Sequence, residues 1–88
     1  MRFAWDAEKN ERNIAKHGVA FEYAVLIFSG RVAVRVDDRR DYGEPRWIGL
    51  GAVDGRVFCV VWTTRSSEVY RIISARKANE RETKAYHS

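Results

Sequence analysis

The apolar run Arg56–Thr63, with the letters RVFCVVWT, places the tightest constraint on how this chain can fold. Its apolar residues follow one another without alternation, so a strand built from them is apolar on both faces and belongs at the centre of a sheet. Asp54 and Gly55 come directly before it and are a strong hairpin signal. We therefore expect Pro45–Ala52 to be its antiparallel neighbour, with the proline at the strand start, where a missing N–H is tolerated.

A second stretch, Glu68–Tyr86, combines an arginine-bearing strand with a polar helix that begins near Ala78. Strict alternation places Arg71 on one face of the strand and Arg76 on the other, each among apolar residues. Because arginine is rarely buried without a partner, both side chains are expected to reach a sheet edge, an acid or an anion. The segment before this strand, Thr64–Ser67, is predicted to be a turn.

The N-terminal region predicts a short strand, Arg2–Trp5, and a mainly polar helix, Ala7–Lys16. Asp6 is a suitable N-cap, and Gly18 suits the C′ position, because glycine readily adopts the left-handed conformation that ends many helices. We expect this helix to pack weakly, since few of its residues point inward: Ala7 and Ile14, with Asn10 as a further candidate.

The following helix is predicted more clearly, because its apolar residues recur at the i, i+3, i+4 and i+7 spacing of a core-facing stripe. The residues at these positions are Phe21, Ala24, Val25 and Phe28. Leu26 and Ile27 widen the stripe, so a well-buried helix is expected to end at Ser29–Gly30. A strand, Val32–Val36, and a charged loop, Asp37–Glu44, come next.

These elements give the order β-α-α-β-β-β-β-α, and short connections between successive strands predict a mainly antiparallel sheet. The expected fold class is α+β, in a single domain over residues 1–88, with two N-terminal helices packed on the sheet. The apolar second helix should cover one sheet face. The opposite face is then left for solvent, a partner or a ligand.

The charge of the chain favours a polyanionic partner. The net charge is +4, and twelve of the sixteen basic residues are arginine, whose planar fork matches phosphate. The surplus lies wholly from Arg31 onward. With one cysteine, Cys59, which is interpreted as a core residue, we expect a reducing cytoplasm. The sequence has neither a signal-peptide pattern at its start nor an apolar run of about 20 residues for a membrane span.

Neither a metal centre nor a cofactor site is expected. The histidines are His17 and His87, and together with one cysteine they give no metal-ligand spacing. The acidic loop carries arginines among its aspartates and lacks the calcium-loop pattern. No glycine-rich loop leads into the lysine and serine of a phosphate loop.

Metal-free phosphodiester chemistry is compatible with the side chains that remain. Cleavage of RNA through its own 2′-OH needs a group that takes the 2′ proton, positive charge for the phosphorane, and a group that protonates the leaving oxygen. The charge can come from arginines: Arg46, Arg65, Arg71 and Arg76. The candidates for proton transfer are Tyr86, Lys9, Lys77 and His17. Bases could stack on aromatic residues: Trp47, Trp62, Tyr42 and Tyr70.

Each of these residues also has a structural interpretation. The tryptophans can belong to the core, Tyr86 can pack the last helix against the sheet, and His17 can cap the first helix. The arginines can pair with surface acids. The residues alone therefore describe a small basic α+β domain, which cleaves RNA, binds nucleic acid without catalysis, or docks another protein on its open sheet face.

Three separated segments resemble the BrnT-type toxins of bacterial type II toxin–antitoxin systems. Trp5–Gly18 (WDAEKNERNIAKHG) resembles their Trp-Asp-x-x-Lys-x-x-x-Asn-x-x-Lys-His-Gly opening, and Val19–Glu22 is similar to the continuation of that motif. Asp41–Gly51 (DYGEPRWIGLG) resembles their Tyr-Gly-Glu-x-Arg strand, and Arg71–Tyr86 their Arg-Ile-Ile-Ser-Ala-Arg close. One departure is Ala20, where these toxins often have a serine N-cap.

The resemblance implies a RelE-like fold and a toxin that halts translation by cleaving RNA. It also implies a BrnA-like antitoxin of the ribbon–helix–helix type, which neutralises the toxin and forms a DNA-binding complex with it. By motif position, the signature residues are Lys9, His17, Arg46, Arg71, Ser74, Arg76 and Tyr86. We predict a catalytic group of Arg46, Arg71, Arg76 and Tyr86, and an RNA-binding group of Lys9, His17, Arg65 and Lys77.

Overall fold

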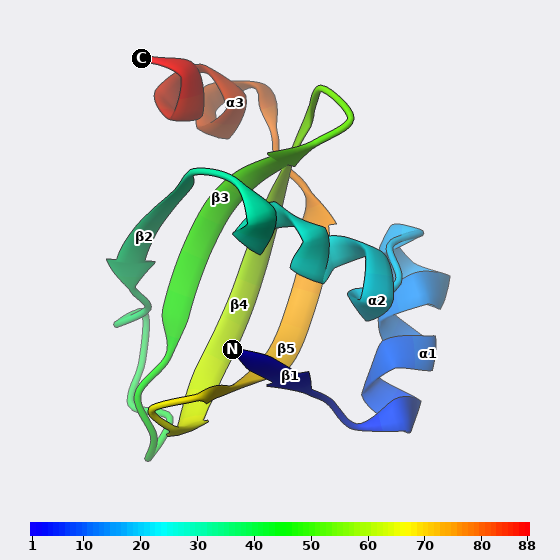
Figure 1. Ribbon diagram of the computed structural model, residues 1–88, viewed down its shortest axis with the longest axis vertical. Coiled ribbons are helices and arrows are strands. Elements are labelled where there is room, and N and C mark those ends of the chain that lie inside the picture. Colours follow the sequence, from blue (N-terminus) through cyan, green and yellow to red (C-terminus); the bar gives the residue numbers. More distant parts are fainter.

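A five-stranded sheet forms the centre of the computed structural model, which describes residues 1–88, and its strand order is β1-β5-β4-β3-β2 (Figure 1). The strands are β1 (Arg2–Ala4), β2 (Val32–Val36), β3 (Trp47–Val53), β4 (Arg56–Ser66) and β5 (Val69–Lys77). β1 runs parallel to β5, and all other neighbours are antiparallel. The prediction of a mainly antiparallel sheet, with the apolar run of β4 at its centre, is confirmed.

The hairpin between β3 and β4 forms as predicted, with Asp54 and Gly55 at positive φ values of 51° and 81°. The end of β4 differs from the prediction, because this strand continues to Ser66. The prediction of a turn over Thr64–Ser67 is therefore wrong, and the chain reverses direction at residues 67 and 68. At the N-terminus, the first strand ends at Ala4, one residue earlier than predicted.

The start of β3 also differs, because the strand begins at Trp47 rather than at Pro45. The carbonyls of the two residues before Trp47 accept hydrogen bonds from outside the β3–β4 ladder. The Pro45 carbonyl accepts a hydrogen bond from the Thr63 hydroxyl at 2.6 Å, and the Arg46 carbonyl accepts one from the Asp37 N–H at 2.8 Å. These bonds fasten the charged loop to the end of the sheet.

Three helices and a 3₁₀ segment surround the sheet: α1 (Ala7–His17), α2 (Phe21–Ala24), η1 (Val25–Ser29) and α3 (Glu80–His87). In Figure 1, α2 and the segment after it cross one face of the sheet, α1 lies beside β5, and α3 lies at one end of the sheet. None of the helices is both long and apolar enough to span a membrane. The predicted layer of helix on one sheet face is confirmed.

The predicted second α-helix is wrong beyond its first turn, since the chain continues from Ala24 as the 3₁₀ helix η1. In this tighter winding, residues three apart lie on the same side. Every third residue is accordingly 0% exposed: Phe21, Ala24 and Ile27. Leu26, predicted to widen the buried stripe, is 47% exposed. Gly51 lets η1 approach closely, because a Cβ there would lie 2.6 Å from Cβ of Ile27.

α1 is attached to the rest of the molecule by polar side chains. Asp6 caps its start and Gly18 ends it at φ 71°, as predicted. Its buried residues, however, are Asn10 and Asn13, whereas Ile14 is 42% exposed. The prediction that Ala7 and Ile14 point inward is therefore wrong, because the inner side of this helix is bound through hydrogen bonds and not through apolar contact.

Asn13 makes the bonds that place α1 against the sheet. Its Nδ2 donates to the Val19 carbonyl at 2.9 Å and to the Ala75 carbonyl at 2.7 Å, and its Oδ1 accepts from the Ala75 N–H at 3.2 Å. β1 pairs only with Val69–Arg71 of β5, so Ala75 has no strand neighbour on that side. The Asn13 amide takes the place of the missing strand and satisfies both backbone groups.

A β-bulge in β5 changes which residues share a face. Ser74 pairs with Val61, but the next residue of β4, Trp62, pairs with Ile72, so Ile73 is an extra residue. Arg71 then aligns with Thr63 and Arg76 with Cys59, and these two β4 residues lie on the same face. The prediction that the two arginines lie on opposite faces is wrong, because it assumed strict alternation through the bulge.

Candidate functional site

The sheet face away from α2 and η1, here called the open face, has an apolar floor. Ile48, Cys59 and Val61 are buried there in a small cluster, with Leu50 and Ile73 packed against it. α1 flanks the face along β5, and α3 covers its far end near β3. The larger core lies on the other face, so the open face can carry polar side chains around an apolar centre.

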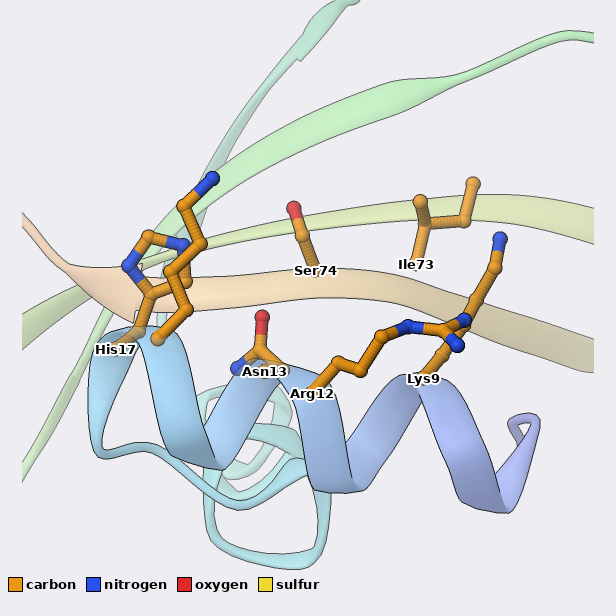
Figure 2. Close-up of a pocket in the computed structure, with 7 residues that line it drawn as sticks. Lys9, Arg12, Asn13, His17, Ile73 and Ser74 are labelled. Atoms are coloured by element: carbon orange, nitrogen blue, oxygen red, sulfur yellow. The ribbon is translucent and has the colours of Figure 1, made fainter.

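A groove of about 340 Å³, here called the α1 groove, runs between α1 and β5. Figure 2 shows the side chains of Lys9, Arg12, Asn13 and His17 rising from α1 towards Ser74 and Ile73 of β5. The complete lining is Lys9, Arg12, Asn13, Lys16, His17, Ile73 and Ser74. Because no acid lies in this lining, the groove favours an anion.

A smaller, more enclosed cavity of about 80 Å³, here called the arginine cavity, lies on the other side of Ser74. Its lining is Arg35, Arg39, Ile48, Cys59, Val61, Ser74, Arg76 and Glu82. Ser74 lines both hollows, so the α1 groove and the arginine cavity meet at that residue. Three guanidinium groups therefore border an apolar floor, and one carboxylate borders it with them.

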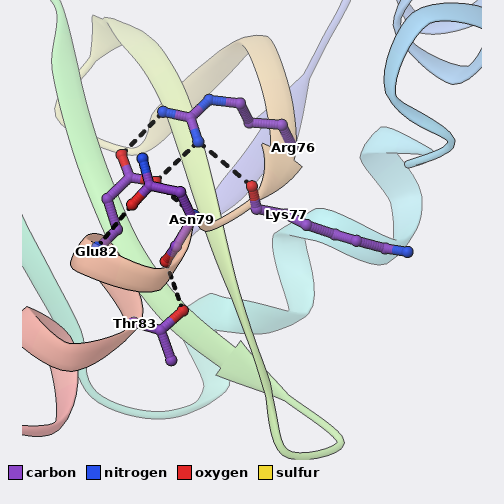
Figure 3. Close-up of polar contacts among 5 residues, drawn as sticks. All are labelled: Arg76, Lys77, Asn79, Glu82 and Thr83. Atoms are coloured by element: carbon purple, nitrogen blue, oxygen red, sulfur yellow. Dashed lines mark hydrogen bonds and ion pairs between the residues drawn. The ribbon is translucent and has the colours of Figure 1, made fainter.

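Arg76 and Glu82 form a two-pronged ion pair at the edge of this cavity (Figure 3). Nη1 and Nη2 of Arg76 donate to the two carboxylate oxygens, each at 2.8 Å. Glu82 also accepts from the Asn79 N–H at 2.9 Å as part of the capping box of α3. The arginine hydrogen bond lowers the pKa of Glu82, and the same contact raises the pKa of Arg76.

Arg39 is held in the same way by Asp37, whose carboxylate is fully buried. Nε and Nη2 of Arg39 donate to it at 2.7 and 2.8 Å, and these bonds lower the pKa of Asp37 to about 2. Arg35 differs from both of its neighbours, because it is exposed and forms neither an ion pair nor a hydrogen bond. It is the uncompensated charge of the cavity.

The structure brings four of the predicted site residues together on or beside the open face. Lys9 and His17 line the α1 groove, and Arg76 lines the arginine cavity. Arg71 lies on the same face of β5, opposite Thr63, and is half-buried. Ser74, a signature residue of the resemblance, lies where the two hollows meet. The elements that present these side chains are α1 and β5.

The other four predicted residues lie apart from this cluster. The Arg46 guanidinium stacks 3.9 Å from the centre of the Tyr42 ring and pairs with Glu44 at 3.2 Å. Arg65 is exposed near the end of β4. Lys77 aligns with Phe58, on the face that α2 covers, and points away from the Arg76–Glu82 pair in Figure 3. No finding tests their functional roles, which stay predictions.

Tyr86 is buried and engaged with the start of β2. Its hydroxyl donates to the Arg31 carbonyl at 2.8 Å, and the Arg31 guanidinium lies 4.1 Å from the centre of its ring. Arg31 also donates to the Tyr86 carbonyl. These contacts favour a role in docking α3, and the predicted catalytic role of Tyr86 stays untested.

Three of the four residues considered for base stacking lie on the covered face: Trp47, Trp62 and Tyr70. Trp62 is 2% exposed, and its ring stacks on Tyr70 with a centroid separation of 5.3 Å. Trp47 packs against the same core. Stacking of an RNA base on the Trp62 ring would require the core to open, which supports the structural interpretation of that residue. Trp47 and Tyr70 are half-buried and line a surface hollow of about 280 Å³ on the covered face.

Sequence reasoning missed five residues that line the two hollows: Arg12, Lys16, Arg35, Arg39 and Glu82. For Arg12 and Lys16 a signal existed, since they lie three and seven residues after Lys9 and thus on the same side of a helix. For Arg35 the signal lies in cross-strand pairing, which local patterns do not reveal. No group of three or more His, Cys, Asp or Glu side chains is arranged to hold a metal ion.

Fold and site together define a small α+β domain with a basic groove beside its open sheet face. Comparisons with known proteins identify the family. A protein-family model described as "Ribonuclease toxin, BrnT, of type II toxin-antitoxin system" matches residues 5–82. The crystal structure of the Brucella abortus ribonuclease toxin BrnT is 27% identical, with a TM-score of 0.62 over 91% of this chain and 99% of that one. The comparison with curated protein sequences gave no match.

This chain belongs to the BrnT family of ribonuclease toxins of type II toxin–antitoxin systems. The resemblance of the three sequence segments is thereby confirmed.

Proposed function

We propose that this toxin is a metal-independent endoribonuclease that cuts RNA on its open face and so inhibits translation in the cytoplasm. The observation that carries the proposal is the convergence of Lys9, His17 and Arg76 around Ser74, from a helix and a strand far apart in the sequence. A chain of phosphates is the polyanion that such a row of cations attracts. RNA further supplies an internal nucleophile, its 2′-OH.

The groups around Ser74 can divide the chemistry among them. When the 2′ oxygen attacks the adjacent phosphorus, the phosphorane gains negative charge, which Arg76 and Arg71 stabilise. Lys9 or His17 exchanges protons with the 2′ oxygen or the leaving 5′ oxygen, since both line the groove that leads to Ser74. The P–O5′ bond then breaks and leaves a 2′,3′-cyclic phosphate. No water molecule or outside reactant is consumed in this step.

The partner that follows from the family is an antitoxin, and we propose that it is a BrnA-like ribbon–helix–helix protein that forms a DNA-binding complex with this toxin. An acidic segment of such a partner would complement the open face, because the α1 groove contains basic and no acidic residues. Neutralisation then consists of covering the surface that RNA needs.

The test is RNA integrity after brief induction in bacteria, without and with the antitoxin, followed by purified protein with RNA and a chelator. Wild-type protein should cleave RNA in cells that lack the antitoxin and as purified protein with the chelator, and RNA should stay intact in cells that also produce the antitoxin. Arg76→Ala should abolish cleavage, whereas Arg56→Ala, which removes one charge from an exposed site on the β3–β4 hairpin, should not. Full cleavage by folded Arg76→Ala protein would refute the proposed site. RNA binding without cleavage by the wild type would leave a nucleic-acid-binding module.

A further inference from the structure

Arg35 and Arg76 face each other across the open side of the sheet, although 41 positions separate them in the sequence. The strand register aligns Arg35 with Ile48, Ile48 with Val61, and Val61 with Ser74. The next row contains Cys59 and Arg76. β2 and β5 are three strand spacings apart, or about 14 Å, so long side chains from both strands can lean over the apolar floor.

We infer that the arginine cavity is a binding pocket for one phosphate group of the RNA backbone, held between Arg35 and Arg76. The inference deepens the proposed function and rests on it, and it adds Arg35, a residue of the outer strand β2, to the RNA-binding site. A phosphate there would lie beside Ser74, at the junction with the α1 groove, so that the rest of the strand can follow that groove.

The size of the cavity suits such a group. A cavity needs about 10–15 Å³ of space open to the centre of a water-sized sphere to hold one water molecule. About 80 Å³ is therefore enough for several water-sized groups, as in a phosphorus atom with four oxygens, and the cavity is more enclosed than the α1 groove. Arginine is suited to this position, because its fork donates two parallel hydrogen bonds to a phosphate.

The charges of the cavity also favour one anion. Arg39 is compensated by Asp37 and Arg76 by Glu82, whereas Arg35 has no acidic partner. One net positive charge therefore remains above the apolar floor. Glu82 occupies two N–H donors of Arg76 and leaves Nε free of a protein partner, so a phosphate can bind without breaking the ion pair.

The experiment is a titration of ¹⁵N-labelled protein with inorganic phosphate at constant ionic strength, followed through the amide signals of Cys59 and Val61, which line the arginine cavity and not the α1 groove. We expect saturable shifts at these signals. Arg35→Ala should weaken phosphate binding about tenfold or more, as expected for a lost charge-assisted hydrogen bond. Arg35→Lys, which keeps the charge and loses the fork, should fall between this variant and the wild type. Arg56→Ala is the matched control and should change binding less than twofold.

Equal phosphate binding by Arg35→Ala and Arg56→Ala would overturn the inference, and so would shifts centred on the α1 groove. Because Arg35 is exposed, the variants should keep the wild-type unfolding midpoint, and Arg35→Gln provides a second neutral substitution. RNA cleavage, measured alongside, separates the two claims. If phosphate binding depends on Arg35 but the protein does not cleave RNA, the proposed function alone is refuted. If the protein cleaves RNA but Arg35→Ala binds phosphate as tightly as the wild type, the inference alone is refuted.

Discussion

Asn13 of α1 and Ala75 of β5 are joined by two hydrogen bonds, one to each backbone polar group of the alanine, at 2.7 and 3.2 Å. A helix side chain thus completes the hydrogen bonding of a sheet residue. Lys9 and His17 are carried by the same helix, so this junction determines how far the cations of α1 lie from Ser74. The stability of the site depends on a polar contact at the place where the sequence predicted a weak apolar one.

Asn13→Ala should destabilise the protein by about 2–4 kcal/mol, because it leaves buried backbone groups of Ala75 and Val19 without partners. The free energy of unfolding in urea measures the change. Ile14→Ala, one position away on the exposed side of α1, should cost less than about 1 kcal/mol. If the two variants are equally stable, the Asn13 bonds do not anchor the helix.

Binding of a non-cleavable RNA should depend on salt through the lysines of the α1 groove. For single strands, the slope of log K against log[salt] is about −0.7 for each phosphate neutralised. Replacing Lys9 and Lys16 together by glutamine should therefore reduce the slope by about 1.4 units. Arg81→Gln with Lys84→Gln removes the same charge from exposed positions on α3 and should leave the slope unchanged. A smaller slope in that control pair would place the RNA outside the groove.

Glu82→Gln isolates the charge of the Arg76 partner. Glutamine can still accept the Asn79 N–H bond of the capping box, so α3 keeps its cap. With one acid fewer, the cavity should bind RNA a few fold more tightly, while the free energy of unfolding falls by about 1 kcal/mol. Glu82→Ala loses the cap as well and should be less stable still. Weaker RNA binding by Glu82→Gln would mean that the carboxylate holds Arg76 in its binding orientation.

Asp37 should make stability depend on pH in the acid range. Hydrogen bonds from Arg39 hold its pKa at about 2 in the folded protein, against an ordinary value of 3.8. The unfolded chain therefore binds the proton more readily, so this contribution is complete above pH 4 and is lost as the pH falls towards 2. Asp37→Asn should cost about 1–3 kcal/mol at pH 7 and progressively less on acidification. The control is Asp38→Asn in the same loop, which should change the free energy of unfolding little at pH 7 or in acid.

Local signals in the sequence predicted the parts of the fold that depend on neighbouring residues alone. The apolar run of β4, the Asp54–Gly55 hairpin and the caps Asp6 and Gly18 are of this kind, and all are confirmed. The change to 3₁₀ winding after Ala24 was not predictable from the pattern. Both windings bury Phe21 and Ala24, and close contact between Ile27 and Gly51 distinguishes them only in three dimensions.

The site was predictable only in part, for the same reason. Lys9, His17 and Arg76 come from motifs that a single segment displays. Arg35 reaches the cavity through a register that spans four strands, and nothing near it in the sequence marks it as different from other surface arginines. The pairing of Arg76 with Glu82 likewise depends on where α3 docks, which helix propensity does not determine.

The bulge at Ile73 has a consequence for how β5 can change in length. In a regular strand, two side chains five positions apart point to opposite faces of the sheet. Without the bulge, Arg71 and Arg76 would therefore lie on opposite faces. With the extra residue, the odd interval behaves as an even one. A chain that lacked Ile73 would have an interval of four and would still present both arginines to the same side. A one-residue deletion at the bulge would thus leave Arg71 and Arg76 on the same face of the sheet. A one-residue deletion between Arg76 and the capping residue Asn79 would instead move α3, and with it Glu82, away from Arg76.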